Sequence, residues 1–188
     1  NTVVLDKPKS VMAETYRSIR TNLQFLAHEK EHKIISVTST FSGEGKTFNS
    51  INIASIFSIS GKKTILLGCD LRKPKIFDDF QITNDKGITT YLIGRASVED
   101  IIQHTAYDNI DIITAGPVPP NPSELLESPA MDQLLNSLKE EYDVVIVDTP
   151  PIGLVTDAVF MMKRSDISVY IVRQNYTTKA AMNTLNEV

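Results

Sequence analysis

The sequence has one cysteine, no long apolar run and no excess of positive charge, and each shortage excludes a class of protein. Cys69 cannot form an internal disulfide and has no thiolate neighbour at metal-site spacing, so a reducing compartment is expected. No apolar run approaches the roughly 20 residues that cross a bilayer, and no signal-peptide pattern opens the chain, so we expect a soluble fragment. The formal net charge of -4 indicates no nucleic-acid partner.

The chain is long enough for one packed core, with 188 residues and 41% hydrophobic content. Because no internal repeat or break in composition divides it, residues 1–188 are expected to form a single domain. A helix is predicted over residues 13–27, where Ile19, Leu23 and Leu26 recur at helical spacing. This N-terminal helical segment, residues 1–32, precedes a core that is expected over residues 33–188.

Short apolar runs alternate with helical patterns along that core. The run over residues 34–38 is rich in β-branched residues and leads into a glycine-containing loop, and residues 49–60 then have the pattern of a helix that Gly61 ends. Further strands are predicted over residues 64–67, 110–114, 143–147 and 167–172. The alternation predicts an α/β fold, in which a parallel sheet has helices on both faces and ligands bind at the carboxyl ends of the strands.

A phosphate-binding loop is indicated between the first strand and its helix, where residues 39–47 read STFSGEGKT. In a P-loop NTPase fold, glycines let backbone N–H groups turn onto phosphate oxygens, and Lys46 adds a full positive charge. The hydroxyl of Thr47 is placed to ligate magnesium. The loop departs from the pattern G-x-x-x-x-G-K-[ST], because Thr40 stands at the first glycine position. The residues expected to bind ATP or ADP are Ser42, Gly43, Glu44, Gly45, Lys46, Thr47 and Phe48.

Two of the predicted strands lead into aspartates. Asp148 follows an apolar run, and burying an unpaired carboxylate costs several kcal/mol, so it needs a partner such as Mg²⁺ or a capping N–H. Asp70 is the second candidate for the metal shell. Arg72 or Lys73 either neutralises a transferring phosphoryl group or is simply solvated. The candidate catalytic residues are therefore Lys46, Asp70, Arg72 and Asp148, and the candidate Mg²⁺ ligands are Thr47, Asp70 and Asp148.

Five segments together carry a family likeness. They are residues 14–23 with Glu14, Arg17 and Arg20, the phosphate loop, residues 70–74 (DLRKP), residues 115–126 (AGPVPPNPSELL) and residues 145–151 (VIVDTPP). On these segments the chain resembles the catalytic domain of bacterial protein-tyrosine kinases that regulate capsule and exopolysaccharide synthesis.

The resemblance implies transfer of the γ-phosphoryl group of ATP to a tyrosine cluster in the C-terminal tail of a neighbouring subunit. It implies a ring-shaped homo-oligomer, an octamer in the family, built through Glu14, Arg17 and Arg20. The residues alone favour a solvated helix face, and the resemblance reverses that preference. Further implied partners are a transmembrane polysaccharide chain-length regulator, fused or in trans, and a tyrosine phosphatase. The implied location is the cytoplasmic face of the bacterial plasma membrane.

Two features depart from the family pattern. The related kinases usually carry an acidic residue two positions before Asp70, where this chain has Gly68, and that carboxylate is thought to help activate the attacking hydroxyl. Because phosphoryl transfer depends mainly on positioning and charge neutralisation, its loss is expected to slow the reaction and to spare nucleotide binding. Tyr170 and Tyr176 are isolated, so the tyrosine cluster is expected beyond Val188.

Two other functions compete with the kinase. One is an ATPase switch like those of the cell-division and plasmid-partition group (ParA/MinD), but Phe41 stands where those relatives often carry a lysine. The other is a nucleotide-binding scaffold with weak or no kinase activity. The string His28-Glu29-Lys30-Glu31-His32 matches a zinc-protease motif, but its highly charged setting favours a solvated connector over a zinc site.

Overall fold

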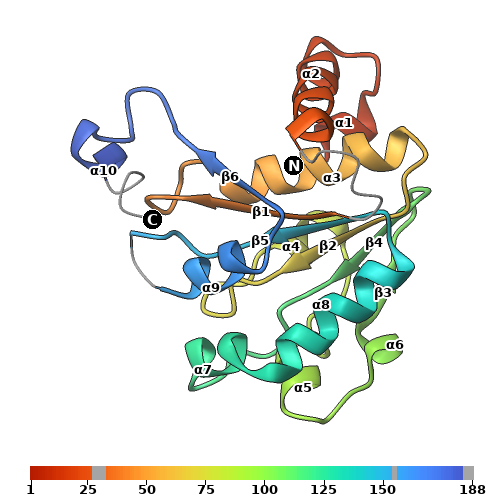
Figure 1. Cartoon of the computed structure of the whole chain (residues 1–188). Helices are drawn as coiled ribbons and strands as arrows, with labels where there is room; N and C mark the ends of the chain where they lie inside the picture. The colour runs from red at the N-terminus through yellow and green to blue at the C-terminus, as the bar shows by residue number, and fades with distance from the viewer. Residues whose placement is uncertain (27–32, 154–155, 184–188) are drawn as a thin grey trace.

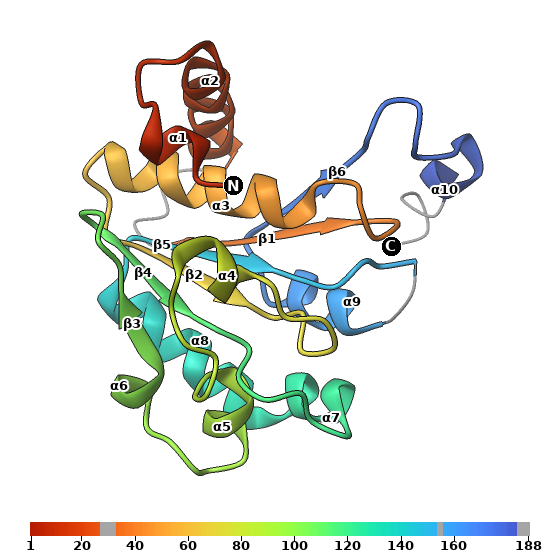
Figure 2. The same cartoon turned by 180° about the vertical axis from the view of Figure 1, so that it is seen from behind.

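The computed structural model describes residues 1–26, 33–153 and 156–183, and it shows one sheet between two layers of helices (Figures 1 and 2). The strands are β1 (Lys33–Ser39), β2 (Thr64–Gly68), β3 (Ile102–His104), β4 (Ile110–Ile113), β5 (Val144–Asp148) and β6 (Ile167–Ile171). Their order across the sheet is β3-β4-β2-β5-β1-β6. All neighbours pair in parallel except β3 and β4, which are antiparallel.

Helices of different lengths connect the strands. They are α1 (Val3–Asp6), α2 (Val11–Leu26), α3 (Lys46–Ile59), α4 (Ile76–Phe80), α5 (Ile88–Leu92), α6 (Val98–Ile101), α7 (Pro122–Glu127), α8 (Pro129–Glu141), α9 (Asp157–Lys163) and α10 (Lys179–Asn183). Helices α1, α2 and α3 lie on one face of the sheet, and α8 and α9 lie on the other (Figure 1). Within the described ranges, no helix combines the length and the apolar character that a membrane span needs.

Two hydrophobic clusters fill the space between the sheet and these layers. Successive side chains of a strand point to opposite faces, so neighbouring residues join different clusters. The cluster on the α8 side includes Ile34, Ile65, Val145 and Leu134. The cluster on the α3 side includes Ile35, Leu66, Ile146 and Phe57. Strands β2 and β5 are buried along their whole length, which explains why they read as continuous apolar runs in the sequence.

The structure confirms the α/β class and five of its strands, and it corrects three details. Helix α3 begins at Lys46 rather than at residue 49, directly after Gly45. In α2 the buried face contains Tyr16 in place of the expected Leu26, which is 61% exposed, because the Tyr16 hydroxyl donates to Asn49 Oδ1 at 2.7 Å. The short antiparallel strand β3 is an addition that the sequence pattern missed, since polar side chains are tolerated at a sheet edge.

The register of the central strands defines one functional edge. Val37 of β1 lies opposite Asp148 of β5, and Asp148 in turn lies opposite Gly68 of β2. Parallel strands end at the same edge of a sheet, so the loops after β1, β2 and β5 meet there. This edge therefore brings together the phosphate loop and both aspartate-containing strand ends.

Candidate nucleotide site

The loop between β1 and α3 has the backbone that its glycines predict. Gly43 and Gly45 adopt φ of 90° and 93°, a region that L side chains rarely enter. Gly45 is also the residue that precedes the first turn of α3. A substitution at either glycine would strain the backbone, so the loop depends on these two positions for its shape.

Three successive N–H groups of this loop have no hydrogen-bond partner among the residues that the structure describes. Among the described residues, none accepts a hydrogen bond from the N–H of Gly43, Glu44 or Gly45. The N–H of Phe41, by contrast, donates to Glu44 Oε2 at 2.6 Å. Unpaired N–H groups beside the positive end of a helix form a suitable site for an anion. The loop can therefore take phosphate oxygens without breaking any hydrogen bond of its own.

Lys46 and Asp148 form the charged centre of the site. Their ion pair measures 2.8 Å between Lys46 Nζ and Asp148 Oδ1, and the two residues are only 8% and 2% exposed. Asp148 also accepts hydrogen bonds from the hydroxyls of Thr47 at 2.8 Å and Ser50 at 2.9 Å. The buried carboxylate that closes β5 is thus fully partnered, and Ser50 is a partner that sequence reasoning did not identify. The signal that could have identified Ser50 is its position one helical turn after Lys46, which places both side chains on the same face of the helix.

Asp70 lies near this centre but is less constrained. Its carboxylate accepts the N–H of Lys73 at 3.0 Å. Burial raises the pKa of Asp70 above its ordinary value, the Lys46 charge and the Lys73 N–H oppose that rise, and the Asp148 charge adds to it. Asp70 and Asp148 therefore influence each other, as two carboxylates that share one cation would.

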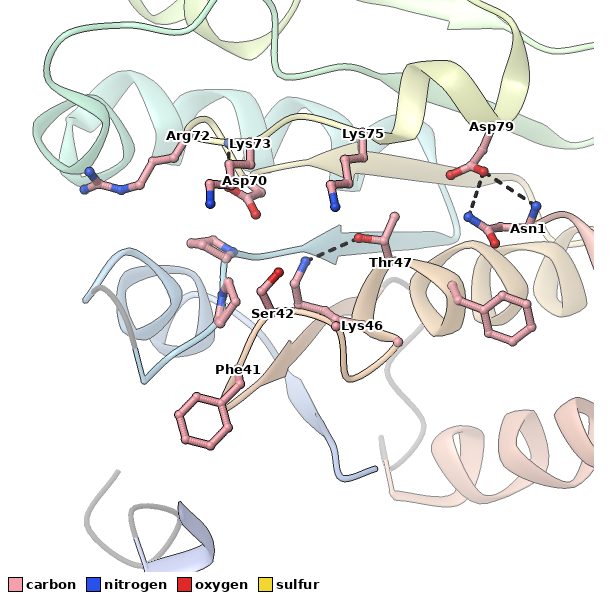
Figure 3. A pocket seen from close by; sticks show the side chains of 15 residues that line it. Asn1, Phe41, Ser42, Lys46, Thr47, Asp70, Arg72, Lys73, Lys75 and Asp79 are labelled. Atoms are coloured by element: carbon pink, nitrogen blue, oxygen red, sulfur yellow. Dashed lines mark hydrogen bonds and ion pairs between the residues drawn. The ribbon is translucent and has the colours of Figure 1, made fainter. Parts of the chain in front are cut away.

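Arg72 points away from the phosphate loop toward α9 (Figure 3). Its Nε is 3.0 Å from Asp157 Oδ2, and its Nη2 donates to the hydroxyl of Ser123 at 2.9 Å. Asp157 is fully buried at the start of α9 and also accepts a hydrogen bond from Ser123. The sequence did not single out Asp157 or Ser123. An acidic residue in a first helical turn is usually explained by its favourable interaction with the helix dipole, so the pairing of Asp157 with Arg72 becomes visible only in the fold.

The loop and the segment after β2 enclose a cavity of about 310 Å³. Six of the residues expected at the nucleotide line it, namely Ser42, Gly43, Gly45, Lys46, Thr47 and Phe48. Asp70, Lys73 and Lys75 lie on the opposite side from Lys46 and Thr47 (Figure 3). Glu44 does not line the cavity, because its carboxylate turns back to bond within the loop.

The three residues expected at an oligomer interface do not form one cluster. Arg17 contacts Glu14 at 2.5 Å and donates to the carbonyl of Pro8 at 2.5 Å. Arg20 instead donates weakly to the carbonyl of Ile56 on α3, at 3.5 Å, and its buried Nε has no partner among the described residues. Glu14 and Arg17 therefore lie together, whereas Arg20 is directed at the neighbouring helix.

The three histidines lie apart from the site or outside the described residues, whereas Cys69 lies next to Asp70. His28 and His32 belong to the undescribed range 27–32. His104 is exposed at the end of β3, and its Nδ1 lies 2.7 Å from Asp111 Oδ1. Cys69 is fully buried, and burial raises the pKa of its thiol well above the ordinary range. This environment is typical of an unreactive cysteine that packs as a small apolar residue.

The donor set at the strand ends suits Mg²⁺ shared with a nucleotide. Mg²⁺ binds oxygen, keeps several waters and uses only one or two carboxylates in such sites. Thr47, Asp70 and Asp148 offer a hydroxyl and two carboxylates, and the unpaired N–H groups of the loop indicate where phosphate oxygens would complete the shell. Within the described residues, no group of three or more His, Cys, Asp or Glu side chains is arranged to hold a metal ion.

Comparisons with known proteins agree with this geometry. Tyrosine-protein kinase YwqD of Bacillus subtilis is 39% identical over 179 residues, which cover 95% of this chain and 76% of that protein. The kinase domain of the Escherichia coli tyrosine kinase Etk superimposes with a TM-score of 0.93 at 34% identity, covering 100% of this chain and 75% of that one. The chain belongs to the bacterial tyrosine kinase family.

Other matches place this kinase-family domain among P-loop proteins. Residues 32–188 match the AAA domain family, which supports nucleotide binding. The cell-division ATPase MinD of Pyrococcus furiosus is a more distant neighbour, with a TM-score of 0.63 and 26% identity over 74% of this chain and 58% of that one. The tyrosine kinases are therefore more similar to this chain than the ATPase switch is, in both sequence and structure.

Proposed function

We propose that this domain binds ATP with Mg²⁺ and transfers the γ-phosphoryl group to protein tyrosine hydroxyls. The observation that carries the proposal is the meeting of three features at one sheet edge: unpaired loop N–H groups, the Lys46 ammonium and the buried carboxylate of Asp148. Phosphoryl transfer relies on positioning and charge neutralisation, which these groups can provide. The kinase names of the relatives supply the acceptor, tyrosine.

Each residue has a distinct role in this proposal. Lys46 and the N–H groups of residues 43–45 hold the phosphate chain. Thr47, Asp148 and Asp70 would hold Mg²⁺, which supplies charge neutralisation at the phosphates when bound. Arg72, fixed by Asp157 and Ser123, contributes positive charge at the rim of the cavity. Ser50 keeps the Asp148 carboxylate in place through its hydroxyl.

The family resemblance supports a more detailed proposal about the acceptor tyrosines, the oligomer and the partners. The acceptor tyrosines would lie in a C-terminal cluster on a neighbouring subunit of a ring-shaped homo-oligomer, an octamer, in which Glu14, Arg17 and Arg20 take part. A transmembrane chain-length regulator would hold the domain at the cytoplasmic face of the plasma membrane, and a tyrosine phosphatase would reverse the modification. Phosphorylation would then regulate capsule or exopolysaccharide synthesis and export.

One assay separates this function from its two competitors. Wild type, Lys46→Met and the control Lys62→Met are incubated with labelled ATP, Mg²⁺ and a tyrosine-rich peptide. Lys62 is an exposed lysine beyond the far end of α3, so its loss should leave activity unchanged. Lys46→Met should lower phosphotyrosine formation by roughly 100-fold or more, because a buried charge at the phosphates is removed.

The remaining outcomes each favour another function. Release of free phosphate without phosphotyrosine would indicate a MinD-like ATPase switch. Nucleotide binding without turnover would indicate a scaffold. An absence of ATP and ADP binding by folded wild type would refute all three.

A further inference from the structure

The turn that follows β6 contacts three successive residues of the phosphate loop. The hydroxyl of Tyr176 donates to the carbonyl of Ser42 at 2.9 Å. The Nη1 of Arg173 donates to the carbonyl of Gly43 at 2.7 Å. The hydroxyl of Thr177 donates to the carboxylate of Glu44. Residues 173–177, which we call the 173–177 turn, therefore hold the loop from outside the cavity.

The turn is ordered by its own hydrogen bonds. The carbonyl of Arg173 accepts the N–H groups of Tyr176 at 3.1 Å and Thr177 at 2.9 Å, and the Thr177 hydroxyl accepts the N–H of Arg173 at 2.9 Å. The Arg173 guanidinium also lies 5.2 Å from the centre of the Tyr176 ring. A turn that is closed in this way can act as a fixed support for the loop.

The held carbonyls determine where the next N–H groups point. In a planar trans peptide the C=O of one residue and the N–H of the following residue point in opposite directions. Fixing the carbonyl of Ser42 on Tyr176 therefore turns the N–H of Gly43 away from the turn. Fixing the carbonyl of Gly43 on Arg173 does the same for the N–H of Glu44. These are two of the three N–H groups that have no protein partner in the described structure.

Glu44 connects the turn to the start of the loop. Its side chain is only 4% exposed, and it accepts the N–H of Phe41 in addition to the Thr177 hydroxyl. One residue earlier, the Thr40 hydroxyl bonds to the hydroxyl of Tyr170 on β6. Thr40 occupies the position where a P-loop pattern has glycine. Strand β6 and its turn therefore support the loop from outside at Thr40 and at residues 42–44.

We propose that Arg173, Tyr176 and Thr177 are positioning residues that hold the phosphate loop in its nucleotide-binding shape. They act through the loop carbonyls and Glu44, and none of them needs to touch the phosphates. This inference rests on the nucleotide binding proposed above. A loop without this support would have to order its N–H groups on binding, which lowers affinity.

The test compares Mg²⁺-ADP affinity by calorimetry for wild type, Tyr176→Phe/Thr177→Val and a matched control, Tyr107→Phe/Thr178→Val. The control removes a tyrosine hydroxyl bonded to Asp6 and a threonine hydroxyl bonded within α10's first turn, so it loses similar groups elsewhere. All measurements are made well below the lowest unfolding midpoint, so that every variant is folded. A third variant, Tyr176→Phe/Thr177→Ser, restores the second hydroxyl.

The Tyr176→Phe/Thr177→Val variant should have a Kd roughly tenfold or more above wild type, since each lost hydrogen bond corresponds to about a fivefold change. The control should bind as wild type does, and the Ser variant should recover about half of the loss on a logarithmic scale. An unchanged Kd in the test variant, an equal rise in the control or no recovery with Ser would overturn the inference. Failure of wild type to bind at all would instead refute the proposed function, and this inference with it.

Discussion

The ends of β2 and β5 lie side by side at the same register, yet they hold their carboxylates in different ways. Asp148 is the last residue of β5 and has three side-chain partners in a nearly closed environment. Its register partner on β2 is Gly68, and the aspartate on that side, Asp70, comes two residues later with a backbone N–H as its partner. A carboxylate inside the strand is fixed by the sheet, whereas one in the following loop is fixed only by its own turn.

The largest effect is expected from removing the fixed carboxylate. Asp148→Asn leaves the buried Lys46 without its counter-charge, which should lower stability by about 3 kcal/mol and kinase activity by roughly 1,000-fold. Asp143→Asn is the control, because Asp143 precedes β5 and bonds to the N–H of Lys63 at 2.8 Å, far from the site. Urea unfolding and phosphotyrosine formation measure both effects. Equal losses in the two variants would contradict the central role of Asp148.

Asp70→Asn should lower activity less than Asp148→Asn does. Unlike Asp148→Asn, it should keep or raise the stability of the protein. Burial raises the pKa of Asp70, so the folded state binds its proton more tightly than the unfolded state does. Stability then falls as pH rises from the ordinary pKa through the raised one, and Asn removes that cost. We expect a thermal midpoint equal to or above wild type without divalent ions at pH 7, and roughly tenfold lower activity with Mg²⁺. A clearly lower midpoint would mean that Asp70 is as firmly paired as Asp148.

Placing a carboxylate at position 68, the last residue of β2, should raise kinase activity. A Cβ added at Gly68 would meet its nearest atoms, Ala115 N and Ile76 Cδ1, at 3.5 Å, which is ordinary van der Waals contact, so the Cβ of a substituted residue fits without a clash. Gly68→Asp should increase phosphotyrosine formation, by less than the ~100-fold of a well-placed general base because positioning and charge dominate this chemistry. Gly68→Ala is the matched control and should leave the rate unchanged. An unchanged rate with Asp would contradict the expectation that the missing carboxylate slows the reaction.

The smallest effect on activity is expected from modifying Cys69, which lies between Gly68 and Asp70. Its thiol is fully buried and its pKa is raised, so little thiolate forms at pH 8. A thiol reagent should label native protein far more slowly than protein in 6 M guanidinium, and kinase activity should survive the treatment. Rapid labelling of native protein, read by mass spectrometry, would show that the β2 end opens readily.

The sequence determined the layers of the fold and the centre of the site. Apolar runs that alternate with helical patterns can be buried only as strands between helices, and parallel strands bring their following loops to one edge. Gly43, Gly45 and Lys46 in STFSGEGKT were recognisable because a backbone with positive φ and a phosphate charge demand those residue types. Gly68 was recognisable from the family pattern alone.

Tertiary structure alone decided which distant residues support that centre. Ser50, Asp157 and the 173–177 turn carry no motif, because hydroxyls, a helix-start aspartate and a Tyr-Thr pair have many ordinary uses in a protein. The same holds for Tyr16 in place of Leu26 on the buried face of α2, and for the short edge strand β3. Local pattern specifies what a segment can form, whereas a contact between residues more than 100 positions apart depends on the packing of the whole sheet.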